Sequence, residues 1–147
     1  MKTASVLAAT LALMATSGPS IGQETLTTQT MRKVAPRGIT EALYTCVDRA
    51  GFDQGRLGAC IQAEKKVQDA RLNSVYRKLL DKLDSNAKES LKAAERAWLD
   101  FNTKSVVAET AIGGTNQVAG FDVAEAELFR YCERANTLDD YFSSTGE

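Results

Sequence analysis

Apolar residues recur every three or four positions along most of this chain, a spacing that predicts helices rather than strands. The first predicted helix is short, because Thr40 can cap its start and Gly51 can end it. Its apolar side chains share one face, which comprises Leu43, Cys46, Val47 and Ala50. No alternating strand pattern competes with helix anywhere in the sequence.

Two longer helices are expected after a turn at residues 53–55. The first spans about Arg56 to Leu83 and places its apolar residues on one broad stripe. This stripe comprises Leu57, Ile61, Leu72, Val75, Tyr76, Leu79 and Leu83. The second begins near Asn86, because Asn86 and Glu89 have the spacing of a capping box. Its apolar side comprises Ala87, Leu91, Ala94, Trp98 and Phe101.

A loop is predicted over residues 108–120, around Gly113 and Gly114, and the last helix is signalled by Asp122 and Glu125. The buried face of this helix is expected to comprise Phe121, Ala124, Leu128, Tyr131, Cys132, Ala135, Leu138 and Phe142. Short turns favour antiparallel neighbours. The sequence therefore predicts an all-α fold, an antiparallel bundle of three main helices plus one short N-terminal helix.

Residues 1–22 have the layout of a secretory signal peptide. Lys2 precedes an apolar run that is too short to span a bilayer, and small residues follow it, so we place cleavage after Gly22. Residues 23–38 are polar and lack an apolar period, which predicts a flexible tether; an extended strand lying on the domain is the alternative. Residues 39–147 form the helical domain. We expect a periplasmic or secreted protein without a membrane span.

Export to an oxidising compartment favours a disulfide among the three cysteines. Cys46 precedes Gly51 by five residues and Cys60 follows Gly55 by five, so the two thiols can face each other across a helical hairpin. We therefore expect a disulfide that staples Cys46 to Cys60, with Cys132 as a buried free thiol. A bond from Cys132 to one of the other two cysteines is the alternative.

The composition excludes several kinds of chemistry. The absence of histidine removes Ser-His-Asp triads, Cys–His pairs and the usual zinc sites. A net charge of −1 gives no electrostatic case for nucleic-acid binding. We expect no enzyme activity, no cofactor and no metal. An enzymatic alternative would use Glu64 and Glu95 with raised pKa values, whereas the simpler interpretation pairs these carboxylates with Arg71 or Arg96.

Three further features have both a structural and a binding interpretation. Trp98 and Phe101 could line a pocket, but a Trp at helical spacing among Ala and Leu favours a core position. Asn73 lies just beyond the edge of its apolar stripe and is expected to bond a neighbouring backbone group, with a surface contact as the alternative. Residues 121–147 carry seven acidic residues against Arg130 and Arg134, which would attract a cationic partner.

These elements also occur in a particular order. They are Cys46, Cys60, "LNSVY" at 72–76, "KESLKAAERAWLDF" at 88–101, Gly113-Gly114-Thr115 and "RANTL" at 134–138. In this order the chain resembles, over roughly residues 43–142, the LprI-like lysozyme-inhibitor N-terminal domain family of small exported helical domains. It departs from the family at Asn102-Thr103, where members often carry Arg-Asp, and near Val106, where they often carry a Cys. The motif positions expected to be structural are Leu72, Asn73, Tyr76, Trp98, Arg134 and Leu138.

The resemblance implies an inhibitor that binds a lysozyme in the cell envelope. The candidate contact is the glycine-containing loop, whose polar side chains could bond within a sugar-binding cleft. Its residues are Gly113, Gly114, Thr115, Asn116 and Gln117. The alternative is a periplasmic scaffold or interaction module for another partner, and the sequence does not predict an oligomeric state.

Overall fold

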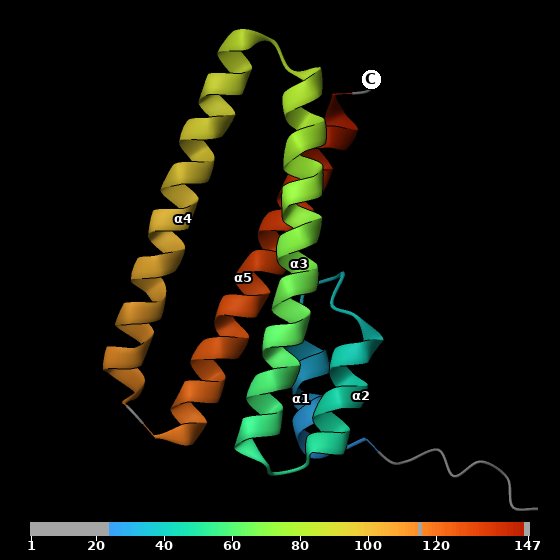
Figure 1. Ribbon diagram of the computed structural model, residues 1–147, viewed down its shortest axis with the longest axis vertical. Coiled ribbons are helices and arrows are strands. Elements are labelled where there is room, and N and C mark those ends of the chain that lie inside the picture. Colours follow the sequence, from blue (N-terminus) through green and yellow to red (C-terminus); the bar gives the residue numbers. More distant parts are fainter. Residues whose placement is uncertain (1–23, 115, 146–147) are drawn as a thin grey trace, which may run out of the picture.

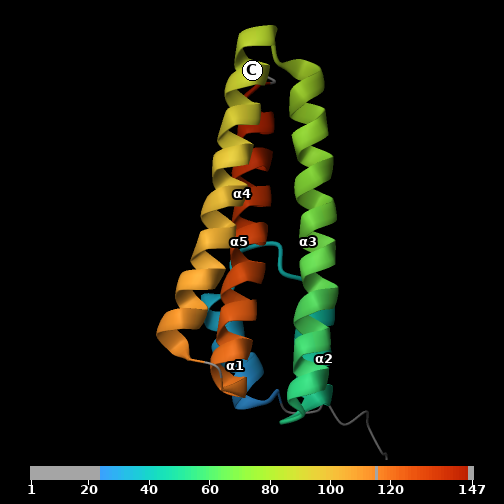
Figure 2. The same cartoon turned by 60° about the vertical axis from the view of Figure 1, so that its left-hand side comes forward.

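The computed structural model describes residues 24–114 and 116–145 and confirms the all-α prediction. Its helices are α1 (Leu26–Val34), α2 (Glu41–Ala50), α3 (Gln54–Lys82), α4 (Ser85–Gly113) and α5 (Gln117–Ser144). The long helix α3 lies along α5, and α4 packs chiefly on α5 (Figure 1). The short helix α2 lies beside the N-terminal half of α3, and α1 packs on α2. The α2–α3 turn, the α4–α5 turn and the start of α1 therefore share one end of the molecule (Figure 2).

The core consists of two clusters of buried apolar side chains. One cluster joins α1 and α2 to α3 and α5, and comprises Met31, Leu43, Tyr44, Val47, Ala50, Leu57, Cys60, Ile61 and Leu128. The other lies towards the opposite end and comprises Leu72, Val75, Leu79, Leu91, Ala135 and Leu138. Helix α4 contributes only Leu91 to these buried sets. The predicted apolar side of α4 is thus only partly buried, and Phe101 is 58% exposed.

The short helix α2 occupies the predicted span between Thr40 and Gly51, whose φ is +59°. The start of α4 differs from the prediction. Asp84, rather than Asn86, is its N-cap, and the Asp84 carboxylate accepts a hydrogen bond from the Ala87 N–H at 2.8 Å. The Asn86–Glu89 capping box was therefore wrong, because an earlier acidic residue already satisfies the free backbone donors of the first turn.

The flexible tether predicted for residues 23–38 is wrong for residues 26–34, which form α1. Thr28 and Met31 are buried. The Asp48 carboxylate of α2 accepts hydrogen bonds from the Thr25 N–H at 2.9 Å and from the Thr28 hydroxyl at 2.6 Å. Helix α1 shows no apolar period because only Met31 among its large apolar side chains is buried. The rest of its attachment comes from the carboxylate of Asp48, which is distant in sequence. The signal peptide predicted at residues 1–22 lies outside the described residues.

The loop predicted over residues 108–120 is also largely wrong. Helix α4 continues to Gly113 and α5 already begins at Gln117. The glycines that suggested a loop mark the end of a helix, since Gly114 adopts φ +81° as the C-cap of α4. The two helices are therefore joined by a tight turn.

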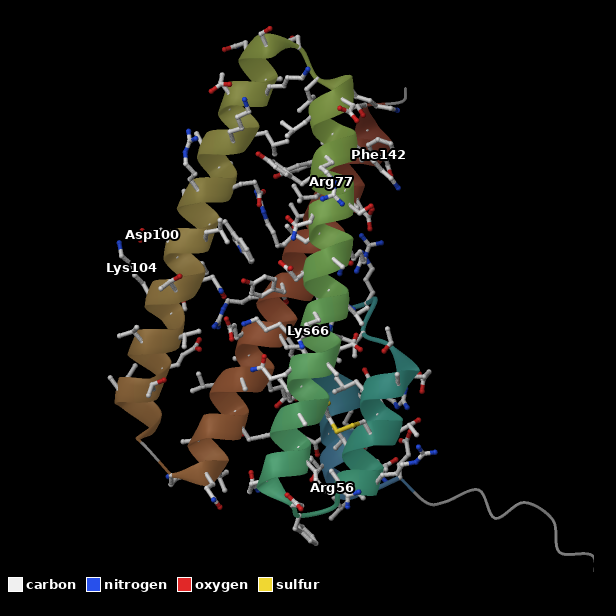
Figure 3. The ribbon with its side chains drawn as sticks, viewed as in Figure 1. Arg56, Lys66, Arg77, Asp100, Lys104 and Phe142 are labelled. Carbon is white, nitrogen blue, oxygen red and sulfur yellow. A yellow bond between two sulfur atoms is a disulfide. The ribbon has the colours of Figure 1, made fainter. Side chains whose placement is uncertain are left out.

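The predicted Cys46–Cys60 disulfide is present and links α2 to α3 with a Cα–Cα distance of 5.7 Å (Figure 3). Cys132 is a buried free thiol, as expected. A crosslink that closes a loop of this size stabilises a fold by roughly 3 kcal/mol in the chain-entropy model. None of the helices in the described ranges is both long and apolar enough to cross a membrane.

We expect the docking of α1 to depend on pH through Asp48. Burial raises the pKa of Asp48, but hydrogen bonds from Thr28 and Thr25 outweigh burial. The pKa of Asp48 in the folded protein therefore lies below its ordinary value of 3.8. Because the pKa is lower in the folded than in the unfolded protein, the ionised Asp48 stabilises the docked α1 at pH values above the ordinary pKa. This stabilisation is lost as the pH falls through the pKa of Asp48 in the folded protein. Hydrogen-exchange protection of α1 should therefore fall below about pH 3.8 while α3 stays protected.

The Asp48→Asn variant should lose protection of α1 near neutral pH, because an uncharged amide oxygen accepts the hydrogen bonds from Thr25 and Thr28 more weakly than a carboxylate does. Thr30→Ala, on the exposed side of the same helix, is the matched control and should keep it. Protection of α1 that is independent of both pH and Asp48 would contradict this interpretation.

Candidate functional site

The predicted contact residues that the structure describes, Gly113, Gly114, Asn116 and Gln117, lie where α4 ends and α5 begins. Gly113 ends α4, and the Gly114 N–H donates to the Thr110 carbonyl at 3.1 Å. Asn116 is the N-cap of α5, and its side-chain oxygen accepts from the Ala119 N–H at 2.9 Å. Gln117 is the first residue of α5, and Thr115 lies outside the described residues. The Asn116 side-chain oxygen is thus engaged in the cap, while the Asn116 amide group and Gln117 remain exposed.

An open hollow of about 500 Å³ lies beside this turn, between the end of α4 and the start of α5. Its walls are mainly apolar, with two carboxylates. The lining comprises Glu109, Ile112, Gly113, Asn116, Val118, Ala119, Asp122, Val123 and Ala126. The ends of α4 and α5 therefore border a surface on which an apolar group can be buried.

Two arginines of α5 hold α4 in place, and Arg130 does so in the C-terminal half of α4. Arg130 donates from Nε to the Asn102 side-chain oxygen at 2.8 Å and from Nη1 to Glu109 at 2.6 Å. Arg134 donates to Glu95, and both side chains of this ion pair are mostly buried. Charge-assisted hydrogen bonds of this kind are stronger than neutral ones. Polar contacts, more than apolar burial, therefore set the position of this half of α4.

Most of the family-motif residues lie in packed positions of the bundle. Leu72 and Leu138 are buried in the second core cluster, and Tyr76 packs against it. Trp98 packs edge-on against Tyr131, with ring centroids 5.2 Å apart. Arg134 forms the buried ion pair described above.

Asn73 is the exception among the motif residues. Its amide donates to the carbonyl and the carboxylate of Asp69, at 2.9 and 3.1 Å, in its own helix on an exposed face. The predicted bond to a backbone group exists, but it anchors no neighbouring segment.

Glu64 and Glu95 take part in separate networks and do not form a pair of catalytic carboxylates. Glu64 is buried and accepts hydrogen bonds from the Thr40 N–H at 3.0 Å, the Thr40 hydroxyl at 2.5 Å and the Gln68 amide at 2.8 Å. Glu95 pairs with Arg134. The expected partners Arg71 and Arg96 were therefore wrong for both carboxylates.

Sequence patterns missed the polar side chains that bind the segment between α1 and α2. We call this segment, residues 35–40, the connector. Gln68 donates to the Gly38 carbonyl at 2.7 Å, and the Asn136 amide donates to the Arg37 carbonyl at 2.9 Å. The Cys132 thiol donates to the same Arg37 carbonyl at 3.2 Å. No short-range pattern in the sequence could pair residues separated by 30 to 99 positions.

Arg71 braces this arrangement from α3. It donates to the Asn136 side-chain oxygen at 2.5 Å and to Asp139 at 2.7 Å. Gly38 adopts φ +100°, and a Cβ atom there would lie 2.5 Å from the Arg71 Nη1 atom. Burial raises the pKa of the Cys132 thiol, although Arg71 opposes this shift. The thiol is thus kept protonated as a donor to the connector.

The family model described as Lysozyme inhibitor LprI matches residues 46–138, which is more than half of the chain. The chain therefore belongs to the LprI lysozyme-inhibitor family. The matched region begins at Cys46 and ends at Leu138, so it contains the disulfide, α3, α4 and most of α5, while α1 lies outside it. Neither curated proteins nor solved structures gave a match.

We expect removal of one partner of the Glu95–Arg134 pair to cost more than removal of both. Arg134→Met leaves Glu95 buried without its cation, which should lower the free energy of unfolding by about 3–5 kcal/mol. Glu95→Leu combined with Arg134→Met removes both charges and should cost less. Urea unfolding measures both values. Lys104→Met, which breaks the exposed pair with Asp100, is the control and should cost less than about 1 kcal/mol. A single variant no less stable than the double variant would refute this role.

Proposed function

We propose that this chain is exported with cleavage after Gly22 and binds a lysozyme in the periplasm or outside the cell, inhibiting it by surface contact. Membership of the LprI family, from the match over residues 46–138, is the observation that carries this proposal. Inhibition by contact requires a frame that keeps its shape when it binds. The Cys46–Cys60 disulfide and the buried ion pair between α4 and α5 provide such a frame.

The charge of α5 supports a cationic partner. Of the acidic residues predicted to form an attractive surface, Glu127, Asp139 and Asp140 pair with basic side chains of this chain. Asp122 and Glu125, near the α4–α5 turn, have no ion-pair partner within the described ranges. The uncompensated negative charge of Asp122 and Glu125 lies beside the turn that is proposed as the contact. Lysozymes are commonly basic, so this charge would attract such an enzyme. Electrostatic complementarity of this kind mainly speeds association.

A turbidimetric lysis assay tests the proposal. The full chain is expressed, purified from the periplasm, and identified by its intact mass as starting at Gln23. It should slow lysis of bacterial cell walls by a basic c-type lysozyme when present in micromolar excess. Bovine serum albumin at the same concentration should not. Undiminished lysis at a large excess of the purified chain would end this proposal.

A periplasmic scaffold remains the second candidate, and one observation favours it. Leu99 and Phe101, which flank Trp98 in α4, are 50% and 58% exposed. Dimerisation through a Cys132 disulfide, the other feature that would favour a scaffold, is opposed by the burial of that thiol. Pull-down from envelope extract, compared with pull-down on immobilised lysozyme, separates the two functions.

A further inference from the structure

Exposed apolar side chains gather at one end of the molecule. Six large aliphatic or aromatic side chains among the described residues are more than 60% exposed. All of them except Val107 line one of two hollows at this end of the molecule. The other five are Leu26, Val34, Phe52, Ile112 and Val118. Single exposed apolar residues are ordinary, but a cluster marks an interaction surface.

These five side chains line two adjoining hollows. The first is the hollow beside the α4–α5 turn, and the second, of about 430 Å³, lies between α1, the α2–α3 turn and α5. Val118 and Asp122 line both, so the two hollows form one continuous surface around the start of α5. We call this surface the end groove. Figures 1 and 2 show the same turns meeting at this end of the bundle.

The end groove carries negative charge only. Its charged lining residues are Glu109, Asp122 and Glu125. Glu109 is paired with Arg130, which leaves the other two carboxylates uncompensated. Burial raises the pKa of Glu125, and the neighbouring charge of Asp122 adds to this shift. A cation brought to this position would relieve an existing repulsion.

A different hollow on the outer face of α2 and α3 shows the opposite polarity. It lies next to the disulfide and is lined by Arg49 and Arg56. Arg56 is seen in Figure 3 at the start of α3, close to the α2–α3 turn. The end of the molecule is thus polarised, with acids beside α5 and arginines beside α2. A partner that presents basic groups has one favourable position on it.

We propose that the end groove is the docking surface for a basic protein partner, which inserts an apolar group beside Val118 and places Lys or Arg side chains against Asp122 and Glu125. This inference rests on the proposed function and specifies which surface meets the lysozyme. Phe52, 96% exposed in the α2–α3 turn, provides a second apolar contact at the rim. Exposed aromatic side chains with apolar neighbours are frequent energetic centres of protein interfaces.

Charge argues against a second copy of this chain as the occupant. Most homodimers are two-fold symmetric, and each copy then presents the same patch to the other. Such a contact would bring Asp122 and Glu125 of one copy towards the same acids of its partner. Like charges brought together in an interface oppose binding. A basic partner removes this repulsion.

The test compares matched variants of the periplasmic full chain binding a basic c-type lysozyme, measured by isothermal titration calorimetry at low and high salt. Val118→Ser removes the shared apolar contact, and its control is Val107→Ser, an equally exposed position on α4 outside the groove. Asp122→Asn with Glu125→Gln removes the uncompensated charge, and its control is Asp100→Asn on the outer face of α4 (Figure 3).

Both groove variants should weaken binding by about tenfold or more, while both controls stay within about twofold. The charge variant should also lose most of the salt dependence of binding. The double charge variant should not lower the melting temperature, because it removes the repulsion between Asp122 and Glu125, so that its weaker binding cannot be ascribed to misfolding.

Other results would overturn the docking surface in distinguishable ways. Tight binding that neither groove variant weakens rejects the end groove but leaves the proposed function intact. No binding by the unaltered chain rejects both. A dimer in sedimentation that Val118→Ser dissociates would make a second copy the occupant. A melting temperature lowered by about 5 °C or more in Val118→Ser would show that Val118 packs against other parts of this chain and is not free to contact a partner.

Discussion

The hydrogen bonds that bind the connector to α3 and α5 are the constraint on which the rest of the molecule depends. The connector has no helix of its own, yet the Gly38 and Arg37 carbonyls are both satisfied by side chains from the two long helices. Arg37 and Gly38 are exposed residues, so each of these hydrogen bonds contributes on the order of 1 kcal/mol. Because the connector is fixed, α1 and α2 are fixed beside α3, and with them the α2–α3 turn.

The two halves of the bundle are stabilised in different ways, and this difference bears on function. Helices α1, α2 and α3 share an apolar cluster and a disulfide, whereas the C-terminal half of α4 is attached to α5 through Arg130 and its polar partners. The end groove lies where these halves meet at the start of α5. A partner bound there would contact two walls. One wall is held by the disulfide and the apolar cluster, and the other is held by the hydrogen bonds of Arg130 to α4. A contact inhibitor needs both walls to keep their spacing.

The sequence predicted those parts of the fold that arise from local periodicity. The long apolar stripes of α3 and α5, the disulfide between Cys46 and Cys60, and the bounds of α2 follow from residue spacing alone, although the Thr40 side chain makes no cap hydrogen bond. Helix α1 was missed because its polar side chains are satisfied by Asp48, a residue more than 20 positions away. The α4–α5 loop was overestimated because a Gly pair marks a helix end as readily as a loop. The end groove could not have been predicted, since its residues come from four helices and two turns.

The most direct test of this account is hydrogen exchange in the Gly38→Ala variant. An alanine at φ +100° is strained, and its Cβ would displace Arg71 from Asn136 and Asp139. We predict faster exchange in the connector, α1 and α2, with α4 and the part of α3 around Leu79 unchanged. Gly120→Ala, at an exposed helical position with open space around it, is the control. Unchanged exchange in the connector and α2 of the Gly38→Ala variant would contradict the claim that these contacts hold the N-terminal half in place.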